Sequence, residues 1–392
     1  MRGRRSFLGS TAGLIASCAV SEPRAEGQPT ATHAAVPAVT LPPSAPARAA
    51  VRTAGWEREW EELVAAARQE GRVSLITWGD RAYLGAIERF EAAFPGVTVE
   101  RLAESSASVW LEAVRRARRT GAQSFDLAFV QPDAALTEGV RDGLWAPIRP
   151  LLFHPDVVAE EVWRDGLANR FLDVRGELCF DWECQVFRAY AVNTDLVTPG
   201  QIRSVTDLLD PKWRGKIVTS EPELGAGLMS AANVLRSHGE GVLKRLLVDQ
   251  RPVMISAARE RVEALIRGRF AFAFALRPKA LAEFREAGAA RNVALLDLPD
   301  ADFVPSTALL YLDRAPHPAA ARLFANWILT REGQTVLAEH APTNSARLDV
   351  PPFEPDGIAT PGAAYFDPDR ESSYAHLAAT RRTVMEVLRR SR

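Results

Sequence analysis

The chain has 392 residues, a length that suits two domains of ordinary size better than one small core. Hydrophobic residues make up 47% and charged residues 25%, as in globular proteins, and past the N-terminus no apolar run approaches the ~20 residues that span a membrane. The formal net charge of -1 argues against a nucleic-acid-binding protein, because such proteins usually carry a strong positive excess.

The first 20 residues have the pattern of a secretory signal, with a basic start, a short apolar run and small residues near a cleavage point. Arg4 and Arg5, followed by Ser-Phe-Leu, resemble the twin-arginine signal of exported proteins. Ile15–Cys18 resembles a lipobox, so we expect Cys18 to be lipidated; cleavage further along, with release of a soluble protein, is the alternative. Residues 21–55 are rich in Ala, Pro and Thr, which predicts a disordered tether.

From Trp56 the sequence alternates helical and strand patterns. Apolar residues at helical spacing predict helices, and short apolar runs predict buried strands. In chain order the first set comprises a helix from 56 that Gly71 stops, a strand over 73–78, a helix over 86–94, a strand from 97, a helix over 108–119, a strand over 126–130 and a helix to 144.

A second alternating set follows an irregular stretch over 145–188. Its strands are predicted over 189–193, 216–219, 252–256, 270–276 and 293–298, and a last strand over 306–312 precedes helices over 318–329 and 331–339. Two such sets predict an α/β protein with two lobes, each a mostly parallel sheet flanked by helices.

Five segments between Val73 and Asp349 carry a family pattern in the same order: AIERFEAAFPGVTVE, FDLAFVQPDAAL, VTDLLDPKWRGKIVTSEP, HPAAARLFANWILTREGQTVL and PTNS. They resemble ABC-transporter substrate-binding proteins of the iron- and small-anion-binding branch, which have the type 2 periplasmic-binding fold. LDPKWRGKI and LTREGQ are the most specific of these matches.

The resemblance implies two lobes joined by a two-stranded hinge, with a small solute held between them and delivered to an ABC permease and ATPase. Closure on the solute is a shift between open and closed forms. We expect hinge crossings within 146–188 and near 302–307, lobe 1 over 56–150 and 303–345, lobe 2 over 151–302, and a C-terminal extension over 346–392 that packs across the lobes. We also expect a monomer without a cofactor, exported and held at the membrane only through the lipid anchor.

One departure from the family concerns iron. The iron-binding relatives place adjacent tyrosines after the strand that corresponds to residues 270–276, whereas this chain has Leu276, Arg277 and Pro278 there. Ferric iron is therefore not the ligand that we expect. An arginine at this place favours a carboxylate, phosphonate or phosphate, because guanidinium binds these groups in bidentate fashion.

Ligands of open parallel sheets bind beyond the carboxyl ends of the strands, so we select polar residues in those loops. Trp78, Asp80 and Arg81 follow the first strand, where a solvated turn is the alternative for Arg81. Hydroxyls and free backbone N–H groups at a helix start attract anions, which favours the serines after the second strand; helix capping is the alternative for two of them. These serines are Ser105, Ser106 and Ser108.

In lobe 2 the loops after strands supply Glu221, Gly225, Ser256 and Arg259, with an exposed surface role as the alternative for Arg259. The carboxylates Asp133 and Glu183 lie in candidate cleft loops and could bind an amine of an amino-phosphonate or amino acid; helix capping or pairing with an arginine is the alternative. Thr307, at the second hinge crossing, completes the candidate ligand contacts.

Cys179 and Cys184 lie close in the sequence and could form a disulfide in an oxidising compartment; two ordinary buried thiols are the alternative. An exported enzyme is the main rival function, but the chain has no GxSxG, HExxH or GxGxxG motif and no phosphate-binding loop. A ligand sensor that docks on a membrane receptor is the second rival.

Overall fold

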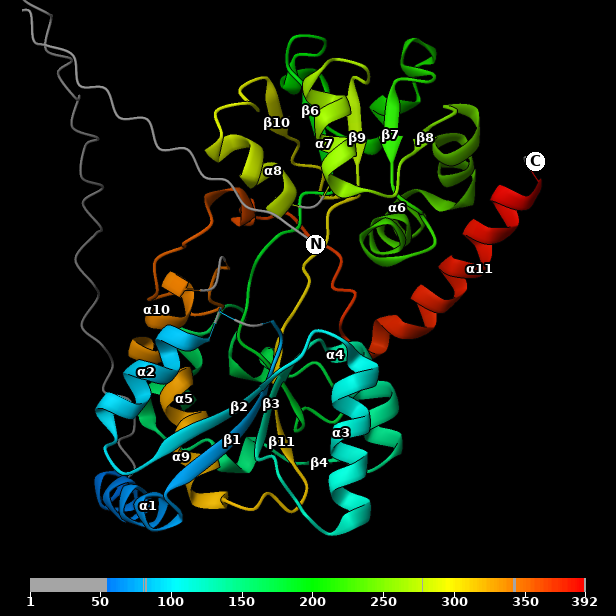
Figure 1. Cartoon of the computed structure of the whole chain (residues 1–392). Helices are drawn as coiled ribbons and strands as arrows, with labels where there is room; N and C mark the ends of the chain where they lie inside the picture. Colours follow the sequence, from blue (N-terminus) through cyan, green and yellow to red (C-terminus); the bar gives the residue numbers. More distant parts are fainter. Residues whose placement is uncertain (1–54, 80, 82, 277, 341–342, 391–392) are drawn as a thin grey trace, which may run out of the picture. The chain divides into compact units, whose positions relative to one another are not determined.

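The computed structural model describes residues 55–79, 81, 83–276, 278–340 and 343–390. The predicted signal, lipidation site and tether lie outside the described residues, as do Asp80 and Arg277. The described strands form two sheets, one of six strands and one of five (Figure 1). Among the described helices, none combines the length and the apolar character that crossing a bilayer requires.

The first sheet contains three parallel strands and three further strands joined through β11. β1 is parallel to β2 and β3, and β11 is antiparallel to β3, β4 and β5. The strand order is β2 (Thr98–Ala103), β1 (Arg72–Thr77), β3 (Leu127–Val130), β11 (Ala308–Leu312) and β4 (Trp145–Ala146), with β5 (Cys179–Asp181) also on β11. The accompanying helices are α1 (Trp56–Glu70), α2 (Leu84–Ala93), α3 (Ala107–Thr120), α4 (Pro132–Ala134), α5 (Pro155–Val158), α9 (Pro318–Leu329) and α10 (Arg331–His340).

The second sheet is also mixed. β7 is parallel to β8 and β9, whereas β6 is antiparallel to β9 and β10. The strand order is β10 (Val293–Leu295), β6 (Tyr190–Asn193), β9 (Phe272–Phe274), β7 (Ile217–Thr219) and β8 (Val253–Met254). Four helices follow or pack near these strands: α6 (Gly225–Lys244), α7 (Ala258–Ile266), α8 (Pro278–Glu286) and α11 (Tyr374–Arg390).

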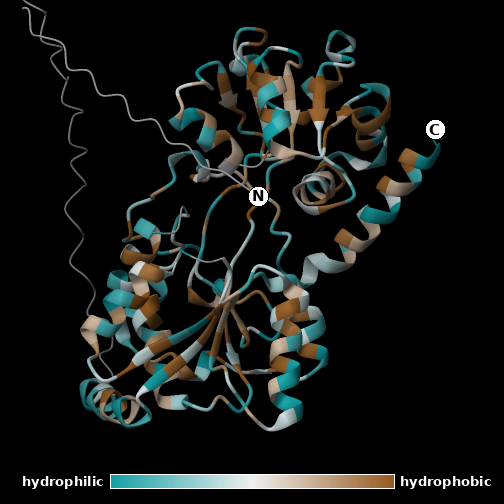
Figure 2. Ribbon diagram, viewed as in Figure 1, coloured by the Kyte–Doolittle hydropathy of each residue, from teal (hydrophilic) through white to brown (hydrophobic). Residues whose placement is uncertain are grey.

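Both faces of each sheet are buried, because alternate residues of a strand point to opposite faces. In β3, Phe129 belongs to one hydrophobic cluster and Ala128 to another. In β9, Phe272 and Ala273 are divided between two clusters in the same way. The strands accordingly stand out as hydrophobic in Figure 2. This arrangement confirms the predicted α/β class with helices on both faces of each sheet.

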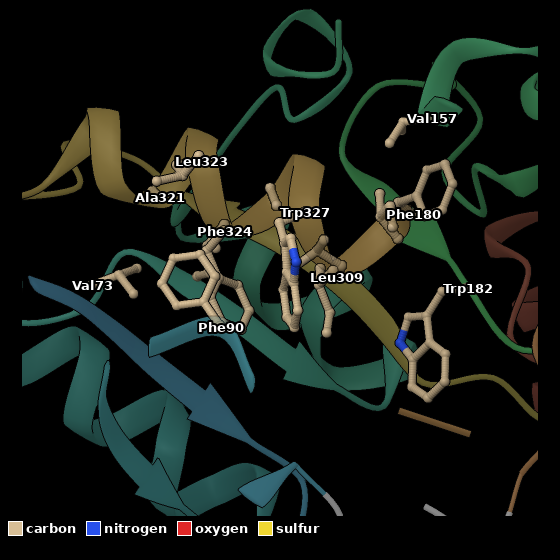
Figure 3. Packing of buried hydrophobic residues seen from close by; sticks show 14 of the residues in the cluster. Val73, Phe90, Val157, Phe180, Trp182, Leu309, Ala321, Leu323, Phe324 and Trp327 are labelled. Atoms are coloured by element: carbon tan, nitrogen blue, oxygen red, sulfur yellow. The ribbon is translucent and has the colours of Figure 1, made fainter. Parts of the chain in front are cut away.

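Helix α9 packs against the first sheet through aromatic residues that its apolar spacing places on one face. Phe324 of α9 meets Phe90 of α2 edge to face, with ring centroids 4.8 Å apart, and Trp327 lies beside them (Figure 3). The predicted α1 ends where expected, because Gly71 takes the left-handed conformation (φ 74°) that closes a helix and that glycine adopts without strain.

The predicted boundary between the lobes at residue 150 is wrong in the structure. Strand β5 pairs with β11 in the first sheet, and Trp163, Phe171 and Trp182 are buried in the core of that sheet. The chain therefore leaves the first sheet only after residue 182, and it returns between β10 and β11.

The C-terminal extension contacts the cores of both sheets. Arg347 pairs with Asp156 beside the first sheet, whereas Phe366 and Val384 are buried in the main cluster of the second sheet. Between them, Tyr374 packs on a cluster of the first sheet.

Candidate functional site

The strand order of the first sheet brings several predicted loops to one edge. β1, β2 and β3 are parallel neighbours, so their carboxyl ends meet there. Because β11 is antiparallel to both β3 and β5, the end of β5 and the start of β11 lie at the same edge. We call it the first-sheet edge, and the described site residues in its loops are Trp78, Arg81, Ser105, Ser106, Ser108, Asp133, Glu183 and Thr307.

The loop after β1 is anchored by its backbone. The backbone N–H of Trp78 donates to the carbonyl of Phe129 in β3 at 2.8 Å, and the Trp78 side chain is half-buried. Arg81 is exposed and makes no ion pair within the described part of the chain. Its guanidinium is therefore available to an anion, although a solvated turn describes it equally well.

The serines after β2 do not act as side-chain caps. Ser106 is the N-cap residue of α3, but its hydroxyl bonds to that of Ser108, with 2.9 Å between the oxygens, and caps no backbone group. The Glu104 carboxylate accepts the Ser106 backbone N–H at 2.7 Å. The Ser106 backbone N–H, a donor that an incoming anion would use, is thus already bound to the negative Glu104. The sequence-based prediction did not include this bond.

Glu183 and Thr307, predicted on separate hinge crossings, are direct partners. The backbone N–H of Thr307 donates to Oε2 of Glu183 at 3.2 Å, and the backbone N–H of Glu183 donates to Asp181 at 3.1 Å. Burial raises the pKa of the Glu183 carboxyl well above its ordinary value, and the charge of Asp181 raises it further. The crossing from β5 is therefore hydrogen-bonded to the crossing into β11 through the half-buried Glu183.

Asp133 lies at the start of α4, after β3, and is exposed. Its carboxylate accepts the neighbouring Ala134 N–H at 2.6 Å, which is a local helix-start contact. It is also near enough to Asp369 and Tyr374 to raise the pKa of each. Asp133 therefore adds negative charge at the first-sheet edge, and the N-cap residue of α4 is Gln131.

Three residues of this region were not predicted from the sequence. Tyr83 follows Arg81 in the same loop, so the strand-end rule would have found it had aromatic hydroxyls been considered. Asp181, which ends β5, is buried, and its pKa is raised to about 7 mainly by burial and lowered in turn by Arg170. Asp369 accepts the Ser306 backbone N–H at 2.8 Å. No sequence signal marks Asp369, since it belongs to the C-terminal extension.

In the second sheet, two predicted residues come together at the ends of parallel strands. Ser256, after β8, donates a hydrogen bond from its hydroxyl to the carboxylate of Glu221, after β7, and this bond lowers the pKa of Glu221. Gly225 begins α6 with φ 47°, a left-handed conformation that favours glycine.

Arg259 takes the surface role that was its alternative. Its side chain is 70% exposed, forms an ion pair with Glu283 at 3.5 Å and lies over the ring of Phe284. Both of these partners lie on the neighbouring helix α8.

The two cysteines are free thiols in the structure, unlike the disulfide that their spacing allowed. Cys179 is buried in a cluster on one face of the first sheet, whereas Cys184 packs on the cluster of the opposite face. An odd separation along extended chain points two side chains to opposite faces, which explains the difference.

Two surface hollows formed by described residues lie elsewhere. One of about 760 Å³ is lined by residues including Asp207, Lys212 and Trp213 beside the second sheet, and another of the same size lies between α2 and α10. Neither contains a predicted ligand residue. Within the described residues, no group of three or more His, Cys, Asp or Glu side chains is placed to hold a metal ion.

Residues 81–340 match the family model of the bacterial extracellular solute-binding proteins. The chain belongs to this family. The match spans the strands of both sheets except β1 and ends at residue 340, before α11. None of the curated proteins matches the chain.

Solved structures of other solute-binding proteins share the fold at low sequence identity. The Trichodesmium protein IdiA (FutA), in complex with iron and citrate, is 17% identical with a TM-score of 0.63, covering 81% of this chain and 99% of that one. Iron-bound HitA from Pseudomonas aeruginosa is 16% identical with a TM-score of 0.57 over 81% and 99%. The spermidine/putrescine-binding protein PotD from Streptococcus pneumoniae is 13% identical with a TM-score of 0.60 over 82% and 99%. These likenesses establish the two-lobed periplasmic-binding fold.

Proposed function

We propose that this solute-binding protein is an exported receptor that captures a small anionic or zwitterionic solute between its two lobes. It then delivers the solute to an ABC permease and ATPase, without chemistry of its own. The observation that supports this most is the convergence of charged and polar loops, including those of both hinge crossings, at the first-sheet edge. Closing the lobes on a solute there would bring in the loops of Glu221, Gly225 and Ser256.

We also propose that ferric iron is not the solute, although two of the structural neighbours hold iron. The support is the sequence Leu276-Arg277-Pro278 after β9, where the iron-binding relatives have adjacent tyrosines. Phenolate oxygens hold ferric iron in those relatives, and this loop offers none. Arg277 is suited to a carboxylate, phosphonate or phosphate instead.

The N-terminal region supports a place for the receptor outside the cytoplasm. We propose twin-arginine export, lipidation at Cys18 and a flexible tether over 21–55 that holds a monomeric receptor near the transporter. A sensor that signals through a membrane receptor is the alternative, and an adjacent permease and ATPase gene pair would favour transport.

The first prediction is that a small solute raises the melting temperature of the mature protein, because a ligand that binds only the folded state stabilises it. A thermal-shift screen of phosphate, phosphonates, carboxylates, amino acids, polyamines and ferric citrate tests this. At 100 times the Kd the stabilisation is about 2.7 kcal/mol, which is readily measured. Stabilisation by ferric citrate alone would contradict our exclusion of iron, and no stabilisation by any of these solutes would contradict the receptor function.

The second prediction concerns Arg277. The Arg277→Ala variant should bind an anionic solute about 10- to 100-fold more weakly, because it loses a charge-assisted contact of roughly 1.5–3 kcal/mol. Isothermal titration calorimetry of the best anionic solute from the screen provides the measurement. Arg259→Ala, which removes an exposed arginine paired with Glu283, is the matched control and should bind as the wild type does. Unchanged affinity in Arg277→Ala would remove this arginine from the site.

A further inference from the structure

The C-terminal extension passes from one sheet to the other more than once. Arg347 holds it beside the first sheet through the 2.8 Å ion pair with Asp156. Farther along, Asp356 pairs with Arg285 of α8, a helix whose apolar side chains pack on a cluster of the second sheet. The chain has therefore crossed from the lobe of the first sheet to that of the second between Arg347 and Asp356, in addition to the hinge crossings.

The extension then returns to the first lobe. A guanidinium N–H of Arg370 donates to the backbone carbonyl of Asn169 at 2.7 Å, and the backbone N–H of Glu371 donates to that of Leu172 at 3.0 Å. Leu172 is buried in a cluster on the first sheet, so these bonds place residues 370 and 371 on that side. The carboxylate of Glu371 adds to this attachment by accepting the backbone N–H of Val174 at 2.8 Å.

Helix α11 contacts both lobes within its first turn. Tyr374, its first residue, packs on a cluster of the first sheet, whereas Leu377 packs on the main cluster of the second sheet. Between them, the ring of His376 donates from Nε2 to the backbone carbonyl of Ala232 in α6, at 2.9 Å. A helix is held rigid by its own backbone hydrogen bonds, so α11, which runs beside α6 in Figure 1, joins the lobes without a flexible linker.

Between these attachments the extension is bonded to both hinge crossings. The backbone N–H of Val186, on the first crossing, donates to the carbonyl of Gly357 at 2.9 Å. The backbone N–H of Val304, on the second crossing, donates to the carbonyl of Phe366 at 2.8 Å. Each crossing therefore has a segment of the extension bonded to it, and a hinge bend that moves either crossing has to carry that segment along or break the bond.

Arg188 joins the first crossing, the second crossing and the extension in one network. Its side chain is only 10% exposed, and it forms ion pairs with Asp302, at 3.4 Å, and with Asp297. It also donates to the backbone carbonyl of Ile358 at 2.7 Å and to the hydroxyl of Tyr365 at 3.1 Å. Separating these segments would leave a buried guanidinium unpaired, which is costly.

We infer that the C-terminal extension is a strap that restrains the two lobes, so that the protein without solute samples a narrow range of lobe separations. A hinge bends when a few residues of its crossings change their backbone angles. The extension adds connections between the lobes at 347–356, 356–370 and 374–377, and it binds both crossings on the way. Closure on a solute is then confined to the separations that the strap permits.

Distances between two spin labels, one on each lobe, test the inference on the mature, full-length protein without any solute. The labels are carried by Glu88→Cys in α2 and Glu260→Cys in α7, both at exposed positions, in a background of Cys18→Ser and Cys184→Ser. Cys179 is buried and is kept. Double electron–electron resonance should give one narrow distance distribution. A distribution with two separate maxima would overturn the strap.

Two variants release the extension from one lobe each. Arg370→Ala removes the bond to Asn169 on the first lobe, and His376→Ala removes the bond to Ala232 on the second. In each variant the population at separations outside the wild-type peak should rise about 2- to 10-fold, the factor that corresponds to the loss of one hydrogen bond. Arg382→Ala is the matched control, because Arg382 is an exposed arginine of α11 without an ion pair in the described part of the chain, and it should leave the distribution unchanged.

Tyr365→Phe provides a second route if Arg370→Ala or His376→Ala does not fold. This variant keeps the ring and removes only the hydroxyl that accepts from Arg188 and donates to Asp297. It should raise the outlying population in the same direction. Wild-type distributions in all the folded variants would overturn the strap. Because the measurement uses no solute, this outcome leaves the receptor function intact, and a thermal-shift screen without any binding solute leaves the strap intact.

Discussion

Replacing Arg347 with alanine should lower the free energy of unfolding by about 3–5 kcal/mol, which is the usual cost of removing one partner of a buried ion pair. The Arg347 side chain is fully buried and lies over the ring of Trp163. Its guanidinium bonds to the carboxylates of Asp156 and Asp349 and to the backbone carbonyls of Asp156 and Leu329, at 2.7–3.0 Å. Alanine would leave these acceptors unpaired and open a cavity.

Urea denaturation of Arg347→Ala and of the wild type measures this cost. Arg58→Ala is the matched control, because the Arg58 side chain is 85% exposed and makes a single helical ion pair with Glu62. Its removal should change the free energy of unfolding by less than about 0.5 kcal/mol. A cost for Arg347→Ala as small as that of the control would show that the guanidinium does not join the C-terminal extension to the first sheet.

The layers of the fold could be predicted from the sequence because hydrophobic spacing is a local property. The runs at Leu127–Val130 and Ala308–Leu312 are strands as predicted, and the predicted bounds of α9, Pro318–Leu329, agree with the structure. Their side chains alternate between two buried faces, which demands continuous apolar runs. Such runs remain visible without any knowledge of their partners.

Pairing between strands that lie far apart in the sequence could not be predicted from hydrophobic spacing. The short strand Cys179–Asp181 stands in an irregular stretch and belongs to the first sheet only because β11, more than 120 residues later, pairs with it. The lobe boundary was therefore placed too early. The short β8 was predicted as five residues but has two, and its Val253 and Met254 are exposed at the end of the sheet.

The candidate site was predictable where it depends on strand ends. Glu183 and Thr307 were selected from separate loops, and the antiparallel pairing of β5 with β11 brings them into contact. Arg259 was selected by the same rule but lies on the surface, because α7 turns its side chain toward Glu283 on α8. Asp369 needed three-dimensional information, since it is recognised only by its contact with Ser306.

The stability of the protein should fall as the pH rises from about 4 to 7. Burial raises the pKa of Asp302 to about 7, from an ordinary value of 3.8, against the opposing effects of the Ala189 and Leu298 N–H groups and of Arg188. Asp181 is also raised to about 7, chiefly by burial. The folded protein therefore keeps both protons over a range in which the unfolded chain has lost them. Where the folded state binds more protons, the free energy of unfolding decreases with pH.

The size of this effect follows from the shift. Three pKa units at about 1.36 kcal/mol each give at most about 4 kcal/mol for each group between pH 4 and 7. The carboxyls with lowered pKa, such as Glu112 and Asp142, act in the opposite direction below about pH 4.5, at the acid end of this window. Urea denaturation at half-unit steps from pH 4 to 8 measures the slope.

The Asp302→Asn variant tests whether Asp302 causes this pH dependence of the free energy of unfolding. Asp302 accepts the N–H groups of Ala189 and Leu298 at 2.7 and 2.8 Å, next to Phe303 on the second hinge crossing. An amide cannot titrate, so the variant should be less stable overall but have a flatter pH dependence than the wild type. A wild-type protein whose stability rises from pH 4 to 7, or a variant with the wild-type slope, would contradict the assignment. Because Asp302 begins the crossing that continues to Thr307, and Thr307 bonds to Glu183 of the other crossing, protonation of Asp302 would then act on the segments that join the two sheets.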